Sequence, residues 1–355
     1  MSEITPAMAY ESPNQPGISV REATPADNTA LLALDRQCVV AAATPVTFDR
    51  TPDFFARSRP YAYWRVYVAE NDSGLIGVGA MALKRVLVNA RPVEAAYLYD
   101  LRVAPSYRRL GVAKAVGDAI RAHVRSFRPT VSYSLVMEGN VASLTFVQSR
   151  GSRPLRLCTL NLIPVESRID PGPDRLKALD DSAVEAALRL ARAAHPGHDL
   201  FPFVDEASVR DRVHRLEQSG FSGLYGWEDG EGLAGCFGLW DYSPIMRMRV
   251  LEATGEWSWV AGRDLHLIFL TPLGFRQAHH LVEVVKMAAA RLRASPTPGA
   301  ARVLAITHDR MDPAYVGLEQ FRPVRMGFTL FGLELSERGG SSFGSRLVFV
   351  DPADL

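Results

Sequence analysis

The segment from Val103 to Ala113 reads VAPSYRRLGVA and joins a predicted strand to a predicted helix. The β-branched, apolar strand ends at Val103, and Pro105 begins a polar turn that contains two arginines. After Gly111, apolar residues recur at the spacing of one helix face. These residues are Val112, Val116, Ile120 and Val124. The segment therefore predicts a strand–turn–helix unit.

The turn has the features of an anion-binding site. A helix that begins there leaves backbone N–H groups without partners and carries partial positive charge at its N-terminus. Gly111 and Ala113 are small enough for a large anion to approach the backbone, while Arg108 and Arg109 add charge and donors. The turn is therefore predicted to bind a pyrophosphate. It matches neither the P-loop nor the dinucleotide-binding pattern. The alternative is an ordinary turn with exposed arginines.

The pattern Arg108-x-x-Gly111-x-Ala113 resembles the R/Q-x-x-G-x-G/A signature of the GNAT superfamily of acyl-CoA N-acyltransferases. The elements predicted around it follow the order of that family. A strand at 18–21 and one or more helices precede three antiparallel strands between 61 and 103, and helix, strand, helix and strand then continue to residue 163. The resemblance implies an α/β fold of the α+β type, with a mixed, mainly antiparallel central sheet flanked by helices.

A second motif supports the same resemblance. The pattern Asn140-x-x-Ser143, followed by Phe146-Val147 and Gly151, is similar to the family's later motif N-x-x-A-x-x-[FL]-Y-x-x-x-G-F. Asn140 can cap the helix predicted over 141–149 while its remaining polar groups face a ligand. A helix cap without a ligand is the alternative.

The resemblance implies that acetyl-CoA is the co-substrate and that the first half of the chain binds it. The cofactor-binding residues implied in this way are Leu101, Arg102, Val103, Arg108, Arg109, Leu110, Gly111, Val112, Ala113, Lys114, Asn140, Ser143 and Phe146.

The sequence departs from the family at two catalytic positions. Val147 stands where many members carry a tyrosine that protonates the departing thiolate, and Tyr97 stands where many carry a glutamate base. The nearest acids are Asp100, Glu94 and Glu138. Because some members have an acid at the position of Asp100, this residue is predicted to be catalytic. An ion pair between Asp100 and an arginine such as Arg102 is the alternative.

The second half of the chain reads as a copy of the first. Residues 66–83 (VYVAENDSGLIGVGAMAL) resemble residues 224–241 (LYGWEDGEGLAGCFGLWD), and a strand and a helix follow in both halves. In register, Phe275, Ala278 and His280 stand opposite Arg108, Gly111 and Ala113. A phenylalanine cannot pair with a phosphate, so the copy is predicted to have lost its anion site. The histidines of this half follow no metal-binding spacing, and no metal site is expected.

We therefore divide the chain into a disordered leader (1–17), an N-terminal GNAT domain with the acyl-CoA site (18–163), a linker (164–181) and a degenerate C-terminal GNAT-like domain (182–355). The first domain lacks one strand that the family usually has. The last predicted strand, Arg346 to Val350, is expected to close its own sheet or to pair with the other domain.

Composition narrows the function classes. The 355 residues carry a net charge of +1 with 47% hydrophobic and 22% charged residues, which is typical of a globular protein and gives no reason to expect nucleic-acid or membrane binding. Three widely spaced cysteines indicate neither a disulfide framework nor a zinc site. With no apolar signal segment, a cytoplasmic location is expected.

The resemblance implies an N-acetyltransferase that acts on a primary amine of a small molecule or peptide. The missing tyrosine and glutamate motivate a rival interpretation, a non-catalytic acyl-CoA sensor or scaffold. A third interpretation is an interaction protein whose second domain forms a homodimer.

Overall fold

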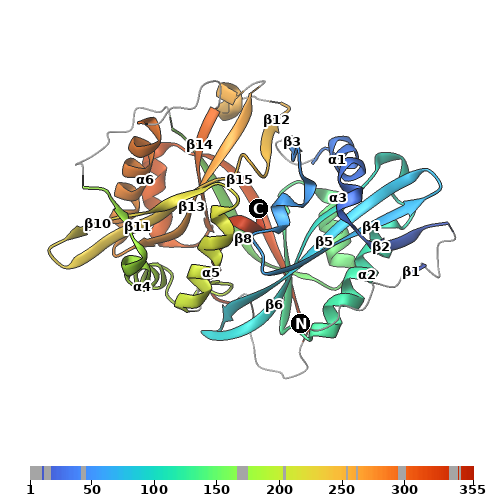
Figure 1. The fold of residues 1–355 in the computed structure, drawn as a ribbon, viewed down its shortest axis with the longest axis horizontal. Coiled ribbons are helices and arrows are strands. Elements are labelled where there is room, and N and C mark those ends of the chain that lie inside the picture. Colours follow the sequence, from blue (N-terminus) through green and yellow to red (C-terminus); the bar gives the residue numbers. More distant parts are fainter. Residues whose placement is uncertain are drawn as a thin grey trace.

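The computed structural model describes residues 10–11, 17–40, 45–165, 175–202, 205–252, 255–260, 263–294, 301–335, 343 and 345–355. Of the predicted leader (1–17), residues 10, 11 and 17 are described, and Tyr10 and Glu11 form a short strand that pairs with residues 19 and 20. Half of the predicted linker (166–174) and most of the run from 339 to 345 lie outside the described residues, while residues 177–179 of the linker form a strand. Within the described part, the strands form one large sheet that runs through both halves of the chain. The two halves lie side by side, with the C-terminal residues between them (Figure 1).

The strand order in the sheet is β1-β2-β4-β5-β6-β7-β15-β8-β14-β13-β11-β10-β9, and β12 pairs with both β13 and β3. In chain order the strands are β1 (Tyr10–Glu11), β2 (Ser19–Glu22), β3 (Val46–Asp49), β4 (Tyr63–Asn71), β5 (Gly74–Val88), β6 (Arg91–Val103), β7 (Val131–Met137), β8 (Arg153–Pro164), β9 (Lys177–Leu179), β10 (Phe221–Asp229), β11 (Gly232–Asp241), β12 (Arg247–Val250), β13 (Asp264–Phe275), β14 (Ala301–Asp309) and β15 (Val324–Glu334). The pairs β6–β7 and β13–β14 are parallel, and the other described pairs are antiparallel. The mixed, mainly antiparallel sheet is therefore confirmed.

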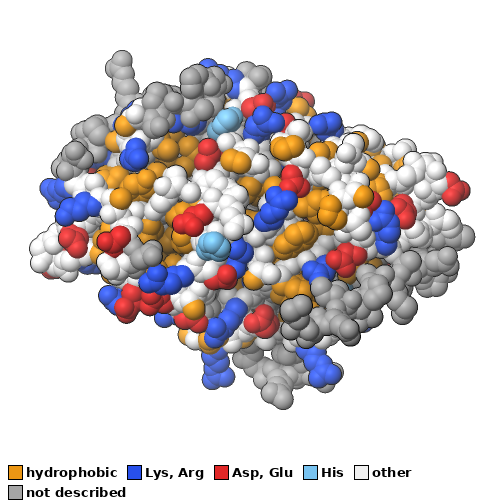
Figure 2. Space-filling model, viewed as in Figure 1, with side chains coloured by type: hydrophobic (Ala, Val, Ile, Leu, Met, Phe, Trp, Pro, Cys, Tyr) orange, Lys and Arg blue, Asp and Glu red, His pale blue; other side chains and the backbone are white. Residues whose placement is uncertain are grey.

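Helices flank the sheet. They are η1 (Pro25–Asp27), α1 (Asn28–Gln37), η2 (Phe54–Ser58), η3 (Pro105–Tyr107), α2 (Val112–Phe127), α3 (Val141–Ser149), η4 (Asp181–Ala183), α4 (Val184–Ala194), α5 (Glu206–Glu217), η5 (Gly255–Val260), α6 (Ala278–Arg293), η6 (Pro313–Phe321) and η7 (Pro352–Asp354). On the face drawn in Figure 2, acidic and basic side chains are interspersed, as the small net charge suggests.

Two glycines of β5 let α2 pack closely against the sheet. A Cβ atom added at Gly77 would lie 2.6 Å from Val112 Cγ1, and one added at Gly79 would lie 2.7 Å from Val116 Cγ1. Since real Cβ atoms do not approach other atoms so closely, larger residues would push α2 away from β5. The alternating residues Ala96 and Leu98 of β6 pack on this α2 face, whereas Tyr97 and Tyr99 belong to the core on the opposite face.

The two halves exchange strands at the centre of the sheet. β15, from the second half, lies between β7 and β8 and pairs with both strands of the first half. β8 in turn pairs with β14 of the second half. The largest hydrophobic core accordingly includes residues of both halves, from Leu31 to Ala353. Each half therefore contributes a strand that the other half needs.

The prediction for the last strand was wrong. The strand that completes the first half is β15, whereas the segment predicted from Arg346 to Val350 forms only an isolated bridge between Val348 and Asp199. Apolar residues alternate along the sequence of β15. This pattern is compatible with pairing to strands of either half, so it does not specify the partner. The shorter apolar segment at 346–350 instead packs under η7, whose residues are buried.

The exchange predicts that the halves fold poorly apart. A fragment of residues 1–175 lacks β15 and exposes the long edges of β7 and β8, which are templates for aggregation. We expect this fragment to be insoluble or to melt well below the full chain. Co-expression with residues 176–355 should restore a soluble complex whose melting temperature approaches that of the full chain. A soluble 1–175 fragment with full-length melting behaviour, measured by calorimetry, would contradict the exchange.

Candidate functional site

The parallel strands β6 and β7 separate after a short ladder. Residues 95–97 of β6 pair with residues 131–133 of β7, and the last pair joins Tyr97 to Tyr133. Beyond this pair β6 continues along β5, and β7 continues along β15. Within the described residues, the edge of β6 from Leu98 to Val103 therefore has no strand partner on the β7 side. This edge offers backbone N–H and C=O groups to a ligand.

A β-bulge distorts β6 within this free edge. The register with β5 shifts between Tyr99 and Arg102, and Asp100 has a φ of 56°. A bulge places an extra residue on one strand and turns its side chain away from strict alternation. Tyr99 and Asp100 consequently contact the same residue, Arg57, whose guanidinium lies 5.1 Å from the Tyr99 ring centroid.

The predicted anion-binding turn leads into α2 as expected. Arg109 and Gly111 have positive φ values of 62° and 79°, and Gly111 is the N-cap of α2 without a side-chain capping bond. The first helical hydrogen bond runs from the N–H of Ala115 to the carbonyl of Gly111. In the described part of the chain, the N–H groups of residues 112–114 have no hydrogen-bond acceptor. They are available to an anion at the N-terminus of α2.

The side chains of the turn differ in exposure. Arg108, Arg109, Leu110 and Lys114 are exposed, while Val112 is buried in the core under α2. Val112 can therefore offer a ligand only its backbone N–H. Arg108 Nε lies 3.4 Å from the carbonyl oxygen of Val103, and Lys114 pairs with Asp118 at 2.8 Å.

The residues of the second motif lie on α3, beside α2. Asn140 is the N-cap of α3, and its Oδ1 accepts a hydrogen bond of 3.2 Å from the N–H of Ser143. Phe146 lies close to Gly117, where an added Cβ would be 3.1 Å from its Cζ. None of the α3 residues is buried. The structure thus brings this motif next to the first one and leaves the α3 side chains accessible.

The strand residues predicted to bind the cofactor point to two different faces. Leu101 and Val103 pack towards α2. Arg102 points to the opposite face, where it forms an ion pair with Asp35 of α1, and burial lowers the pKa of Arg102 to about 10. Of these three residues, Arg102 can meet a cofactor beside α2 only through its backbone.

Asp100 lies in a buried ion-pair network. Its two carboxylate oxygens accept hydrogen bonds of 2.7 Å each from the guanidinium of Arg50, and Arg57 also donates to Asp100. The side chain of Asp100 is only 4% exposed. Burial alone would raise the pKa of Asp100, but the charges of Arg50 and Arg57 outweigh it and lower that pKa. Arg102, the partner considered from the sequence, is more distant, at 3.7 Å.

The other two candidate acids are less confined. Glu94 is exposed, and Glu138 pairs with Arg310 at 3.0 Å on the surface. Asp100 is thus the buried member of the three, at the bulge of the free β6 edge.

The sequence analysis missed a polar cluster on the face of the sheet opposite α2. It consists of Tyr61, Lys84, Tyr97, Tyr133, Asp351 and Asp354, and we call it the tyrosine–lysine cluster. The alternation of Tyr97 and Tyr99 indicates that both face one side of β6, but no local pattern connects them with residues more than 250 positions later. Hydrogen bonds between Asp354 and three tyrosines make this connection.

The corresponding turn of the second half carries a bulkier residue, His280, where the first half has Ala113. The ring of His280, near the start of α6, lies 6.0 Å from the ring of Trp227, and Trp227 also covers Gly235. Among the described residues, no group of three or more His, Cys, Asp and Glu side chains is arranged to hold a metal ion. No described helix is long and apolar enough to cross a membrane.

Comparison with known proteins agrees with this geometry. The model of the acetyltransferase (GNAT) family matches residues 29–151. No curated protein matches the chain in sequence. Among solved structures, N-myristoyltransferase of Saccharomyces cerevisiae with bound myristoyl-CoA has a TM-score of 0.62 at 10% identity, over 98% of this chain and 96% of that one.

Two further structures are similar along most of the chain. A tandem GNAT protein from the clavulanic acid biosynthesis pathway has a TM-score of 0.59 at 15% identity, over 91% of this chain and all of that one. An acetyltransferase-like protein from Pyrococcus horikoshii has a TM-score of 0.56 at 12% identity, over 94% and 95% of the two chains. The fold is therefore that of two GNAT domains in tandem.

The turn before α2 supplies a direct test of cofactor binding. Gly111→Glu introduces a negative charge and a side chain at a positive φ of 79°, at the unoccupied N–H groups of α2. We expect calorimetric titration with acetyl-CoA to show at least about a 100-fold loss of affinity, because the carboxylate repels phosphate at close range.

Gly74→Glu is the matched control, since Gly74 also has a positive φ, of 105°, but lies in the turn between β4 and β5 with open space around it. It should bind acetyl-CoA like the wild type. Equal loss of binding in both variants would indicate backbone strain, and wild-type affinity in Gly111→Glu would rule out the turn as the site.

Proposed function

Residues 29–151 form a domain of the acetyltransferase (GNAT) family within a tandem fold, and on this basis we propose that the protein transfers an acetyl group from acetyl-CoA to a primary amine. The observation that carries the proposal is the junction of the free β6 edge with the uncapped N-terminus of α2. In the second half, the strands β13 and β14 separate in the same way, but His280 near the start of α6 packs against Trp227 where the first half has Ala113.

The proposed binding mode follows from the two unsatisfied backbone surfaces. The pyrophosphate of coenzyme A lies on the N–H groups of residues 112–114, with Arg108 and Arg109 adding charge. The pantetheine arm runs along the edge of β6 from Val103 towards Leu98, as an additional strand would. The accessible side chains Asn140, Ser143 and Phe146 of the neighbouring α3 region border the same site.

The chemistry requires a neutral amine. The amine nitrogen attacks the thioester carbonyl carbon, the C–S bond breaks, and the thiolate of coenzyme A leaves and takes up a proton. Backbone N–H groups on the free β6 edge can stabilise the oxyanion that develops on the carbonyl. A base must accept the proton that the ammonium group of the acceptor loses.

Asp100 contributes to this site as a fixed anion. Asp100 is a weak base, because it accepts three guanidinium hydrogen bonds and the charges of Arg50 and Arg57 lower its pKa despite burial. We therefore assign to Asp100 the role of holding the bulge and the side chains of Arg50 and Arg57 in place beside the thioester.

The aromatic packing favours a short acyl group. Tyr97, Tyr99 and Tyr133 are buried around the end of the β6–β7 ladder, with the Tyr97 and Tyr99 ring centroids 5.0 Å apart. A long acyl chain would have to displace these rings from a close-packed core.

The proposal predicts selectivity for the short thioester. With a panel of primary amines, release of the coenzyme A thiol should proceed with kcat/KM at least about 100-fold higher for acetyl-CoA than for myristoyl-CoA. Equal rates would contradict the acetyl assignment. Tight binding of acetyl-CoA without turnover on any amine would instead support the sensor.

Asp100→Asn tests the positioning role. Loss of the carboxylate removes the charged partner of the buried Arg57 and leaves the buried Arg50 only its longer ion pair with Asp35, at 3.6 Å, which should lower the free energy of unfolding by about 3–5 kcal/mol. At a temperature where the variant is folded, kcat should fall at least tenfold, or about 1.4 kcal/mol, with acetyl-CoA affinity nearly unchanged.

The pH dependence separates the two roles of Asp100. A positioning residue leaves the shape of the pH profile of kcat/KM as in the wild type, whereas loss of the plateau in the variant would identify Asp100 as the base. Wild-type kcat in Asp100→Asn would exclude both roles.

A further inference from the structure

Asp354 lies above the point where β6 and β7 separate. The hydroxyl group of Tyr97 donates to the backbone carbonyl of Asp354, and the hydroxyl group of Tyr133 donates to Asp354 Oδ2 at 2.7 Å. Because Tyr97 and Tyr133 form the last pair of the ladder, these two bonds fix Asp354 on the face opposite α2, next to the free β6 edge. Asp354 therefore faces the proposed thioester position from the side that the cofactor does not occupy.

The carboxylate of Asp354 already binds an ammonium group. Lys84 Nζ lies 2.7 Å from Asp354 Oδ1 and 2.7 Å from Asp351 Oδ2. The same ammonium lies 5.7–6.0 Å from the ring centroids of Tyr61, Tyr97 and Tyr133. Carboxylates and aromatic faces are the groups that recognise a primary ammonium ion. The surroundings of Asp354 are thus suited to an amine.

Lys84 offsets only one of the two carboxylate charges of the cluster, and Arg212 of α5 offsets the other. The charged partners distinguish the two carboxylates. Asp351 is paired with both Arg212 of α5 and Lys84, whereas Asp354 has only Lys84 as a charged partner of its side chain. Burial raises the pKa of both acids, but Arg212 and Lys84 bring that of Asp351 down to about 2, while burial and the nearby Asp351 keep that of Asp354 raised. Asp354 is the carboxylate with capacity for a proton.

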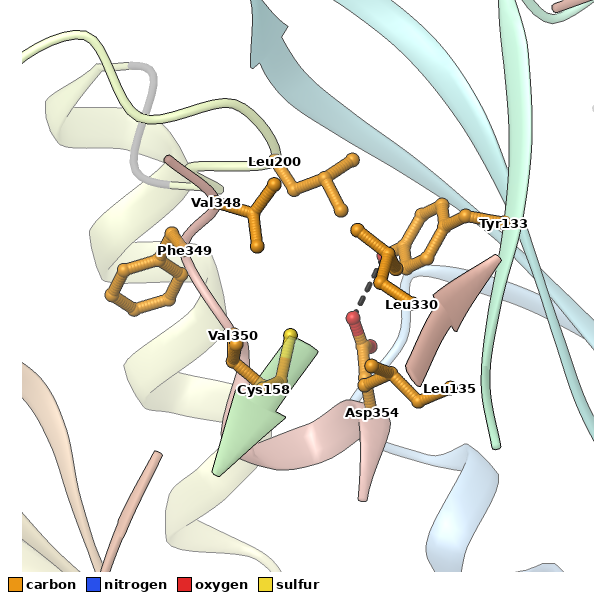
Figure 3. Close-up of a pocket in the computed structure, with 9 residues that line it drawn as sticks. All are labelled: Tyr133, Leu135, Cys158, Leu200, Leu330, Val348, Phe349, Val350 and Asp354. Atoms are coloured by element: carbon orange, nitrogen blue, oxygen red, sulfur yellow. Dashed lines mark hydrogen bonds between the residues drawn. The ribbon is translucent and has the colours of Figure 1, made fainter. Parts of the chain in front are cut away.

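A narrow apolar pocket adjoins Asp354 (Figure 3). Its wall is formed by Leu135, Leu200, Leu330, Val348, Val350 and Cys158, among others. In this conformation the pocket has no room for a water molecule. One side of the pocket is the buried segment 347–351. It is held by its bridge to Asp199 and by hydrogen bonds with Thr307 and Asp309, so an acceptor stem can enter the pocket only if this segment shifts.

We infer that Asp354 is the catalytic base that binds and deprotonates the acceptor, and that the acceptor is a primary amine on a short apolar stem. The inference rests on the proposed function. The ammonium N–H bond breaks and its proton goes to a carboxylate oxygen of Asp354. The nitrogen lone pair then attacks the thioester carbonyl carbon and forms the C–N bond. The C–S bond breaks, and the departing thiolate takes up the second proton that the nitrogen loses, so that charge and atoms balance. The apolar stem lies against the leucine and valine side chains of the pocket.

The pH dependence follows from the groups around Asp354. The titratable and charged groups that face Asp354 come from several elements. They are Lys84 of β5, Tyr61, Tyr97 of β6, Tyr133 of β7, Cys158 of β8, Asp351 of the same C-terminal segment, and Arg57, which donates to the backbone carbonyl of Asp354. The base is active when ionised, so kcat/KM rises with pH through the raised pKa of Asp354 and then reaches a plateau below the pKa of the amine. Without the base, kcat/KM rises tenfold per pH unit up to the pKa of the amine, because only the free amine reacts.

The experiment uses the full chain, acetyl-CoA and n-butylamine. Asp354→Asn should lower kcat/KM at pH 7 at least about 100-fold and abolish the plateau, while calorimetry shows unchanged acetyl-CoA affinity. Asp312→Asn is the matched control, since Asp312 is also a buried carboxylate but pairs with His198 in the second half. It should retain the wild-type profile.

Tyr133→Phe provides a second variant that keeps the carboxylate. It removes the hydroxyl donor to Asp354 Oδ2, which favours the ionised form, so the acidic limb of the profile should shift to higher pH with the plateau retained. 1-Butanol lacks the ammonium group. Its inhibition constant against n-butylamine should therefore be no lower in the wild type than in Asp354→Asn.

Four outcomes would overturn the inference. A plateau in Asp354→Asn, or an unshifted limb in Tyr133→Phe, would show that Asp354 has only a structural role. Acetyl-CoA binding without acetylation of n-butylamine would exclude this acceptor class and leave the cofactor assignment intact. Absence of acetyl-CoA binding in the wild type would instead overturn the proposed function, and the inference with it.

Discussion

The antiparallel pairing of β8 with β15 is the interaction on which the rest of the structure depends. Residues 153–162 of β8 pair with residues 324–332 of β15, so the last strand of each half lies beside that of the other. This pairing joins two smaller sheets into one and gives both β8 and β15 a strand partner on each side. It also brings the C-terminal segment over the first half, because β15 delivers the chain next to β7. The contacts of Asp354 with Tyr97 and Tyr133 are a consequence of this arrangement.

The same arrangement explains why so many charged residues are buried between the halves. Burial of an isolated charge is costly, and it is tolerated when pairs and hydrogen bonds satisfy it. Asp100 is satisfied by Arg50 and Arg57, and Asp351 by Arg212 and Lys84. Arg57 also donates to the backbone of residues 354 and 355 and so joins the bulge of β6 to the C-terminal segment. Electrostatics at the site therefore depends on contacts made by both halves.

The parts of the fold that depend on local patterns were predictable from the sequence. The strand–turn–helix at 103–127, the hairpin β4–β5 and the duplication follow from spacing and turn residues, and the structure contains them. The partner of β8 was not predictable, because its apolar alternation fits either half equally well. Arg346 to Val350 was misassigned for the same reason, as a short apolar run fits a strand and a buried irregular segment alike.

The candidate site shows the same division. The anion-binding turn is a local feature and is located as expected, whereas the partners of Asp100 are 43 and 50 residues away in sequence. The bulge that turns Tyr99 and Asp100 to one side has no signature in the alternation of β6. No local sequence pattern indicated that Asp354 belongs to the site, because its partner Lys84 is 270 positions away in the sequence.

The position of β15 in the chain also has a consequence for synthesis on the ribosome. β7 and β8 are complete once residue 164 has been made, but the strand that separates them ends at residue 334, about 170 residues later. At typical rates of translation, the facing edges of β7 and β8 remain unpaired for roughly 10–30 s before β15 has been synthesised. During this interval the nascent chain exposes apolar strand edges that a chaperone could cover. The half that matches the acetyltransferase family model is synthesised first, but its sheet is completed last.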